Sequence, residues 1–128
     1  MSVFVNFSNH PSIKWGKEQQ AAARQYGDIV DVPFPRLDAG CDEENIRVIG
    51  EDCVARIVSC NPTVVMCQGE FTLTFYVVSK LIEKGIPCVS ACTKRVSNEV
   101  ILEDGTVRKE SLFVFEGFRK YVNEGEKV

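Results

Sequence analysis

The sequence predicts a single α/β domain, residues 1–128, with a mostly parallel sheet between layers of helices and an antiparallel β-hairpin at the C-terminal end. Its composition, 45% hydrophobic and 26% charged residues, is that of an ordinary globular domain. Short apolar runs alternate with segments of helical periodicity as far as about residue 95, which favours right-handed crossovers and parallel strands. After that point Asp104-Gly105 separates two β-rich runs, a strong hairpin signal.

The first strand is expected at Val3–Phe7, where β-branched and aromatic residues fill nearly every position. Ser12 has the chemistry of an N-cap, so a helix is predicted from Ser12 to its stop at Gly27, with Trp15 on its apolar face. A second strand, Asp28–Val32, ends where Pro33 and Pro35 prevent further ladder hydrogen bonds.

The second helix is predicted to begin after an Asp42 cap and to end at Asn61-Pro62. Thr63–Cys67 is a nearly continuous apolar strand, which should be central and covered on both faces. The third helix follows Gln68–Thr72 and ends at Lys84-Gly85, and its expected buried stripe is Phe75, Val78, Leu81 and Ile82. The remaining strands are expected at Ile86–Cys92, Arg95–Leu102 and Val107–Phe115.

Charge and hydropathy exclude several classes of protein. A net charge of −3 argues against a broad basic face for duplex nucleic acid, and no segment has the apolar length of a membrane span. A cytoplasmic location is therefore expected. None of the six cysteines forms a Cys-x-x-Cys pair, so Cys67, Cys88 and Cys92 are interpreted as buried apolar side chains and not as metal ligands; no metal or cofactor is expected.

The candidate site lies where strand order reverses. In an open parallel sheet of order two, one, three, four, the loops after the first and third strands meet at the carboxyl edge, where ligands bind. Both loops precede helices and should offer free backbone amides to an anion. The first contains Asn6, Ser8, Asn9 and His10. Ser8 and Asn9 can bind a ligand or simply form a turn, whereas His10, the only histidine, is predicted to be a phosphate donor or general acid.

The second loop offers Gln68, Gly69, Glu70 and Thr72. Gly69 would let the backbone approach a ligand. Glu70 can complement the helix dipole, hydrogen-bond a ribose hydroxyl or adenine amino group, or take a proton; Thr72 can cap the helix or contact the same ligand. Thr93 and Arg95 are expected on the same rim, with Arg95 either contacting phosphate or lying on solvated surface. The sequence lacks both the P-loop and the Gly-x-Gly-x-x-Gly fingerprint, which disfavours an ATPase or a dehydrogenase.

Three motifs carry a resemblance: Asn6–Pro11 after the first strand, Asp31–Pro35, and Gln68–Glu70 at the third helix. With them the chain resembles small CRISPR-associated proteins related to the CARF (CRISPR-associated Rossmann fold) superfamily, some of which are stand-alone ring nucleases of type III systems. The resemblance spans most of the chain to about Arg95 and implies a Rossmann-like domain; the parallel core is expected over about 1–95, and the hairpin that the Asp-Gly turn predicts over about 95–118. It further implies a homodimer that binds cyclic oligoadenylate and cleaves it without metal, through attack of a ribose 2′-hydroxyl on the neighbouring phosphorus, so switching off CRISPR signalling.

Within that interpretation His10 and Glu70 are the expected catalytic residues, and the chain departs from the best-known CARF pattern at Glu70. Two alternatives stay open. A nucleoside deoxyribosyltransferase-like or glycohydrolase enzyme would use Glu70 as nucleophile on an anomeric carbon. A non-catalytic nucleotide-sensing subunit would use the same loops for binding alone.

Overall fold

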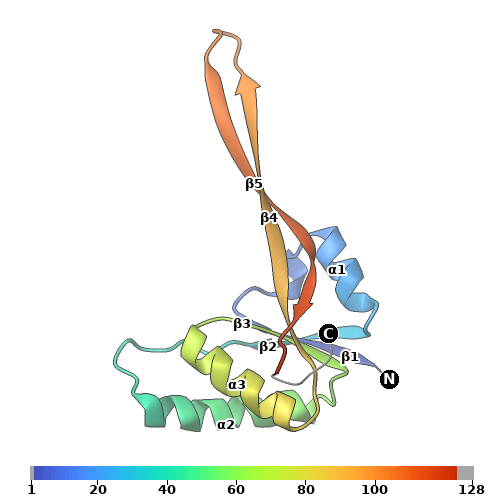
Figure 1. The fold of residues 1–128 in the computed structure, drawn as a ribbon, viewed down its shortest axis with the longest axis vertical. Coiled ribbons are helices and arrows are strands. Elements are labelled where there is room, and N and C mark those ends of the chain that lie inside the picture. Colours follow the sequence, from blue (N-terminus) through green and yellow to red (C-terminus); the bar gives the residue numbers. More distant parts are fainter. Residues whose placement is uncertain (1, 124–128) are drawn as a thin grey trace.

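The computed structural model describes residues 2–123, which form one five-stranded sheet flanked by helices (Figure 1). Along the chain the elements are β1 (Val3–Ser8), the short 3-10 helix η1 (Ser12–Lys14), α1 (Lys17–Arg24), β2 (Asp28–Pro33), α2 (Glu43–Ser59), β3 (Val64–Gln68), α3 (Phe71–Glu83), β4 (Cys88–Ile101) and β5 (Val107–Lys120). No helix among these residues is long and apolar enough to cross a membrane.

The sheet order is β2-β1-β3-β4-β5, with the first four strands parallel and β5 antiparallel to β4. The predicted α/β class, the mostly parallel sheet and the reversal of strand order at β1 are therefore confirmed. All six residues of β1 are buried, as are the first four of β3, because helices cover both faces of these strands.

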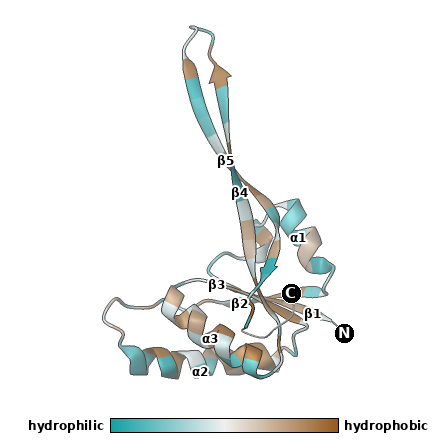
Figure 2. Cartoon of the chain, viewed as in Figure 1, coloured by the Kyte–Doolittle hydropathy of each residue, from teal (hydrophilic) through white to brown (hydrophobic). Residues whose placement is uncertain are grey.

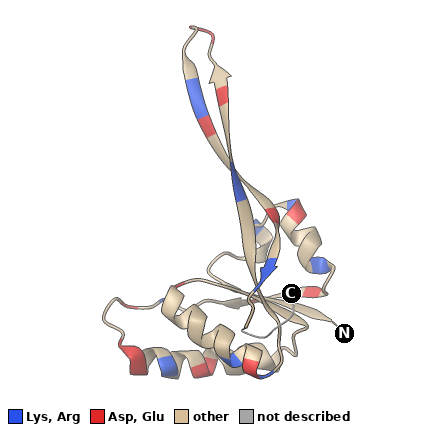
Figure 3. Cartoon of the chain, viewed as in Figure 1, with Lys and Arg blue, Asp and Glu red and all other residues tan. Residues whose placement is uncertain are grey.

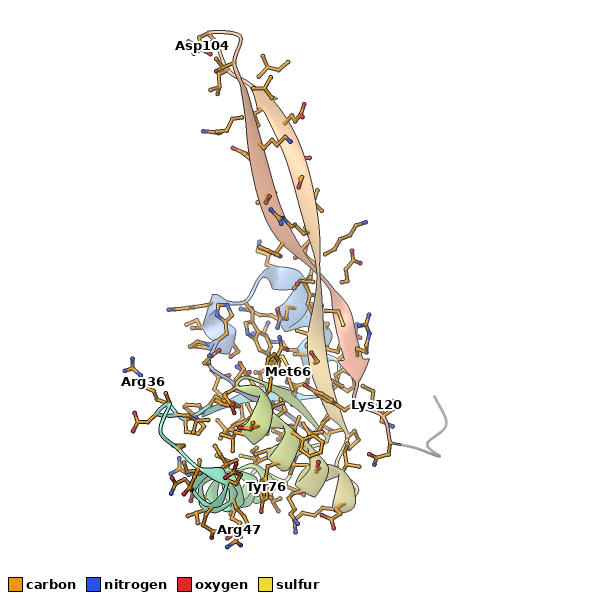
Figure 4. The ribbon with its side chains drawn as sticks, turned by 60° about the vertical axis from the view of Figure 1, so that its left-hand side comes forward. Arg36, Arg47, Met66, Tyr76, Asp104 and Lys120 are labelled. Atoms are coloured by element: carbon orange, nitrogen blue, oxygen red, sulfur yellow. The ribbon has the colours of Figure 1, made fainter. Side chains whose placement is uncertain are left out.

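Alternate side chains of the central strands enter two separate hydrophobic clusters. Val5 and Val65 point toward α2 and α3, where Ile57, Val77 and Leu81 complete the larger cluster. Phe4 and Met66 point the other way, and their cluster contains Trp15, Ala23, Val64 and Val89. Figure 4 places Met66 between the sheet and the α1 side of the molecule.

The α2/α3 layer fits the sequence pattern except at one aromatic residue. Asp42 caps α2 in a reciprocal capping box with Asn45, as predicted for the cap. The buried face of α3 consists of Leu73, Thr74, Val77, Val78 and Leu81. Phe75, expected in this stripe, is 76% exposed. The prediction was wrong there because the helix turns its Leu73–Val77–Leu81 row, at four-residue spacing, toward the sheet.

The predicted start of the first helix is also wrong. Ser12 begins the 3-10 helix, and α1 begins only at Lys17 after a Gly16 N-cap. Trp15 interrupts the helix with an extended backbone, because its indole N–H donates to the His10 carbonyl (3.2 Å) and its ring packs edge-on against Phe4. These two tertiary contacts fix Trp15 outside the helical path.

The largest difference concerns the C-terminal hairpin. The expected strand Ile86–Cys92 and the expected hairpin strand Arg95–Leu102 are one strand, β4, which pairs with β5 along the whole length of both. A register shift at Cys92/Thr93 is the only interruption in the described ladder. The turn falls at the predicted Asp104-Gly105, with Gly105 at φ +84°. Residues 94–114, which we call the arm, extend away from the body on the α1 side of the sheet (Figure 1).

Candidate functional site

A cleft of about 520 Å³ lies at the carboxyl ends of β1 and β3, between α1 and the first part of β4. It occupies the point where strand order reverses, which is where ligands bind in open α/β sheets. Six predicted residues line it together with four others: Ser8, Asn9, His10, Gln68, Gly69 and Thr93, then Trp15, Gln19, Met66 and Ala91. His10 carries the only ionisable side chain among these lining residues.

A hydrogen-bond network fixes the loop after β1. The His10 carbonyl accepts from Asn6 Nδ2 (3.0 Å) and from Trp15 Nε1 (3.2 Å). The Ser8 hydroxyl lies 2.6 Å from Asn6 Oδ1 and accepts from the His10 N–H at 3.2 Å. The His10 backbone is thereby held toward the protein while its exposed side chain lines the cleft.

Asn6 is a positioning residue and does not line this cleft. It is almost completely buried, and its amide nitrogen also donates to Asp31 Oδ1 at 3.1 Å. The second oxygen of Asp31 accepts from the Ser12 backbone N–H at 3.1 Å. Asp31 therefore connects β2, β1 and the 3-10 helix. A charged residue between Val30 and Val32 was the sequence signal for this role, which our site prediction did not use.

The loop after β3 is ordered by different contacts. Gln68 Oε1 accepts from the Ala91 backbone N–H at 2.8 Å, so the group that Gln68 can offer to a ligand is its amide nitrogen. A Cβ at Gly69 would lie 2.5 Å from the Phe34 ring. Glycine is therefore favoured at this position by the packing of Phe34. Gly69 also lines the cleft, so the approach of a ligand to its backbone stays a prediction.

Glu70 and Thr72 lie outside the cleft. The Glu70 carboxylate caps α3 by accepting from the Leu73 backbone N–H (2.8 Å), and it also accepts from the Thr72 hydroxyl. These hydrogen bonds lower the pKa of Glu70 below its ordinary value. Thr72 lines a separate cavity of about 390 Å³ with Phe75 and Tyr76.

The expectation of free helix amides at both loops therefore does not hold. The Leu73 amide is occupied by Glu70, and α1 begins only at Lys17, seven residues after His10, with the 3-10 helix between them.

Arg95 is also outside the cleft: it lies on the arm and donates to Ser111 Oγ at 3.1 and 3.3 Å. Ala91 and Thr93 are the residues of β4 that line the cleft.

The cysteines are divided between the core and its edge. Cys53, Cys67 and Cys88 are buried, and burial raises the pKa of Cys67 far above its ordinary range and that of Cys88 to about 12. Cys92, expected to be buried, is half-exposed because it lies where β4 leaves the body. Within residues 2–123, His, Cys, Asp and Glu side chains form no group of three that could hold a metal ion.

The structure defines the chain as a three-layer α/β protein with a strand-end cleft and a projecting two-stranded arm. By sequence it belongs to the family described as the uncharacterized protein MJ1673 family, whose profile matches residues 2–119. No curated protein and no solved structure matches the chain significantly.

Proposed function

We propose that the cleft binds one nucleotide unit of a cyclic oligoadenylate and that the protein is a ring nuclease. The observation that carries the proposal is the cleft itself: it lies at the strand reversal, is lined mainly by uncharged hydrogen-bonding side chains, and contains one ionisable group, His10. Polar donors from Asn9, Gln68 and Thr93 suit phosphate and ribose oxygens, and Trp15 and Met66 add apolar surface for a base.

The size of the cleft supports a shared ring. A volume of about 520 Å³ falls within the range of small-ligand pockets and suits about one nucleotide. A cyclic oligoadenylate contains several nucleotides, so two clefts from two protein copies would hold different units of one ring. A cytoplasmic homodimer that ends type III CRISPR signalling is the cellular role that follows from the resemblance.

The proposed reaction needs alignment and one acid. The ribose 2′-oxygen bonds to the adjacent phosphorus while the bond from phosphorus to the 5′-oxygen breaks. Solvent takes the hydroxyl proton, and the His10 imidazolium gives a proton to the leaving 5′-oxygen. The products are a 2′,3′-cyclic phosphate and a 5′-hydroxyl. Glu70 receives no catalytic role here, because its carboxylate caps α3 outside the cleft.

Single-turnover cleavage of cyclic tri-, tetra- and hexaadenylate tests this proposal, with affinity measured in parallel by calorimetry. We expect His10→Ala to lower the cleavage rate by about 10²-fold or more, the usual effect of losing a general acid, while affinity changes only a few-fold. Glu70→Ser is the matched control: it keeps a capping side chain without a carboxylate, so its rate should stay near that of wild type.

Three results would contradict the proposal. Binding of none of the rings would reject the ligand class. Binding without cleavage by wild-type protein would reject the nuclease and favour a nucleotide-sensing subunit. Release of free adenine, with loss of activity in Glu70→Ser, would reject the mechanism in favour of a glycohydrolase.

A further inference from the structure

The arm exposes apolar side chains on both of its faces. Phe113 is 72% exposed, Ile101 77%, Val107 57% and Leu112 56%. None of the residues in the two core clusters comes from residues 94–114. A two-stranded ribbon is marginally stable alone in water, and exposed apolar side chains on such an element usually mark a contact surface. Figure 2 shows the apolar segments along the arm.

The side chains of one arm face form a definite pattern. Directly paired residues of antiparallel strands point to the same side of a ribbon, and alternate pairs share one face. From the body outward, the four pairs on this face are Arg95 with Phe113, Ser97 with Ser111, Glu99 with Lys109, and Ile101 with Val107. The face therefore begins with the Arg95–Phe113 pair, has a small polar pair and an oppositely charged pair in the middle, and ends with two β-branched residues.

The pattern is complementary to itself when reversed. A second arm placed face to face, running in the opposite direction and centred on the level of the Asn98–Glu110 pair, brings Phe113 of each copy against Ile101 and Val107 of the other. The small Ser97 and Ser111 then leave space for the longer Glu99 and Lys109. We infer that the arm is the contact surface for a second copy of this chain, with the two arms antiparallel about a two-fold axis.

Charge favours another copy of the chain over nucleic acid as the occupant. The arm carries four basic residues and four acidic ones, so its formal charges cancel: Lys94, Arg95, Arg108 and Lys109 against Glu99, Glu103, Asp104 and Glu110. The two signs alternate along the ribbon (Figure 3), and no basic stripe is formed. A nucleic acid would require net positive charge, whereas a face with both signs can pair with its own reversed copy.

The length of the arm brings the partner to the cleft. From Thr93 to Leu102 a strand spans about 30 Å, and a two-stranded ribbon is roughly 10 Å wide, so the arm-to-arm contact covers on the order of 300 Å² per copy. This is less than half of the roughly 800 Å² usual for a stable interface. A stable dimer therefore needs further contact area, which the tip, marked by Asp104 in Figure 4, can supply against the partner's body.

In the antiparallel arrangement the tip meets the root of the partner's arm, where Ala91 and Thr93 line the cleft. Each copy would thus supply a wall to the other's cleft. The importance of this wall for ligand binding rests on the proposed function, but pairing through the arms does not.

Analytical ultracentrifugation over a wide concentration range tests the pairing without any ligand. We expect wild-type protein to be dimeric, and Phe113→Ser and Ile101→Ser each to raise the dimer dissociation constant by at least about tenfold. Within one chain Phe113 and Ile101 are about 20 Å apart, yet they meet across the proposed interface. The double variant should therefore raise the dimer dissociation constant by less than the product of the two single fold-increases.

Phe71→Ser is the matched control, because Phe71 is a comparably large apolar residue, 89% exposed, at the start of α3 and outside the arm. It should not change the dissociation constant. All three residues are exposed, so unchanged circular dichroism is expected, together with unchanged thermal transitions at a concentration where wild type is monomeric, and both will verify folding. A monomeric wild-type protein at every concentration would overturn the inference. So would a dimer that Phe71→Ser dissociates and the arm variants do not, and so would binding of duplex or single-stranded RNA by the monomer through Phe113.

Discussion

At the scale of the residue, the site depends on side chains that do not touch the cleft. Asn6 is buried and links three segments: the His10 carbonyl, the Ser8 hydroxyl and the Asp31 carboxylate. The sequence predicted that Asn6 and Ser8 belong to the site, because polar residues at the end of an apolar strand are unusual. It could not predict that they position the loop and leave His10 to face the cleft, since that depends on Trp15 and Asp31 approaching from other elements.

We expect Asn6→Asp to destabilise the protein by about 2–4 kcal/mol at pH 7, because a buried donor becomes a charge facing two acceptors. Repulsion and burial raise the pKa of the introduced carboxyl in the folded state, so the variant should regain stability as the pH falls through that value and the group is protonated. Urea unfolding at pH 7 and pH 5 measures both effects. Asn9→Asp, at an exposed position of the same loop, is the control and should change stability little. Equal stability of Asn6→Asp and wild type would contradict the hydrogen-bond network around Asn6.

At the scale of the element, local sequence predicted where helices and strands exist better than where they end. The Asp42 cap of α2 is confirmed because its partner Asn45 lies three residues away. The predicted start of α1 and the predicted length of β4 were wrong because both depend on distant partners. Trp15 packs on Phe4, and residues 93–101 pair with β5. The preference for glycine at Gly69 has the same origin, since the ring that a Cβ would meet belongs to Phe34.

The Glu70 cap makes a pH-dependent contribution to stability. Because folding lowers the pKa of Glu70, its stabilisation is fully present above the unfolded value, near 4.5, and is lost as the pH falls through the lower folded value. Glu70→Gln should therefore cost about 0.5–1 kcal/mol at pH 7 and progressively less below pH 4.5, as measured by chemical unfolding across this range. Glu83→Gln, at the opposite end of α3, should show little or no loss at pH 7, since a negative charge there opposes the helix dipole and its exposed ion pair with Lys80 (3.5 Å) contributes little. A pH-independent cost at Glu70 would refute the charged cap.

At the scale of the whole molecule, the body and the arm are stabilised in different ways. Among the described residues, the buried hydrophobic core ends at Val89. The return strand β5 is held to the body by Phe118, which packs on Phe4, and Tyr121, the residue after β5, donates to the Cys67 carbonyl at 2.8 Å. The alternation of strands and helices sufficed to predict the body, because its core is formed by consecutive elements. The hairpin was predicted over nearly the same residues as the arm, because Asp104-Gly105 is a local turn signal; the sequence did not predict that its first strand continues β4 without a break.

The body should therefore fold without the arm. Lys94 and Val114 are directly paired, so residues 95–113 can be replaced by a two-residue Asn-Gly turn that closes a hairpin at this level. Because no core side chain is removed, we expect the unfolding free energy of the shortened protein to lie within about 1 kcal/mol of that of wild type, measured by urea unfolding at a concentration where wild type is monomeric. Where wild type forms dimers, its transition temperature should rise with protein concentration, since dimerisation stabilises only the folded chain. The transition temperature of the shortened protein should stay constant. Loss of cooperative unfolding on shortening would show that the arm is part of the fold, and a concentration-dependent transition in the shortened protein would show that the copies associate through the body.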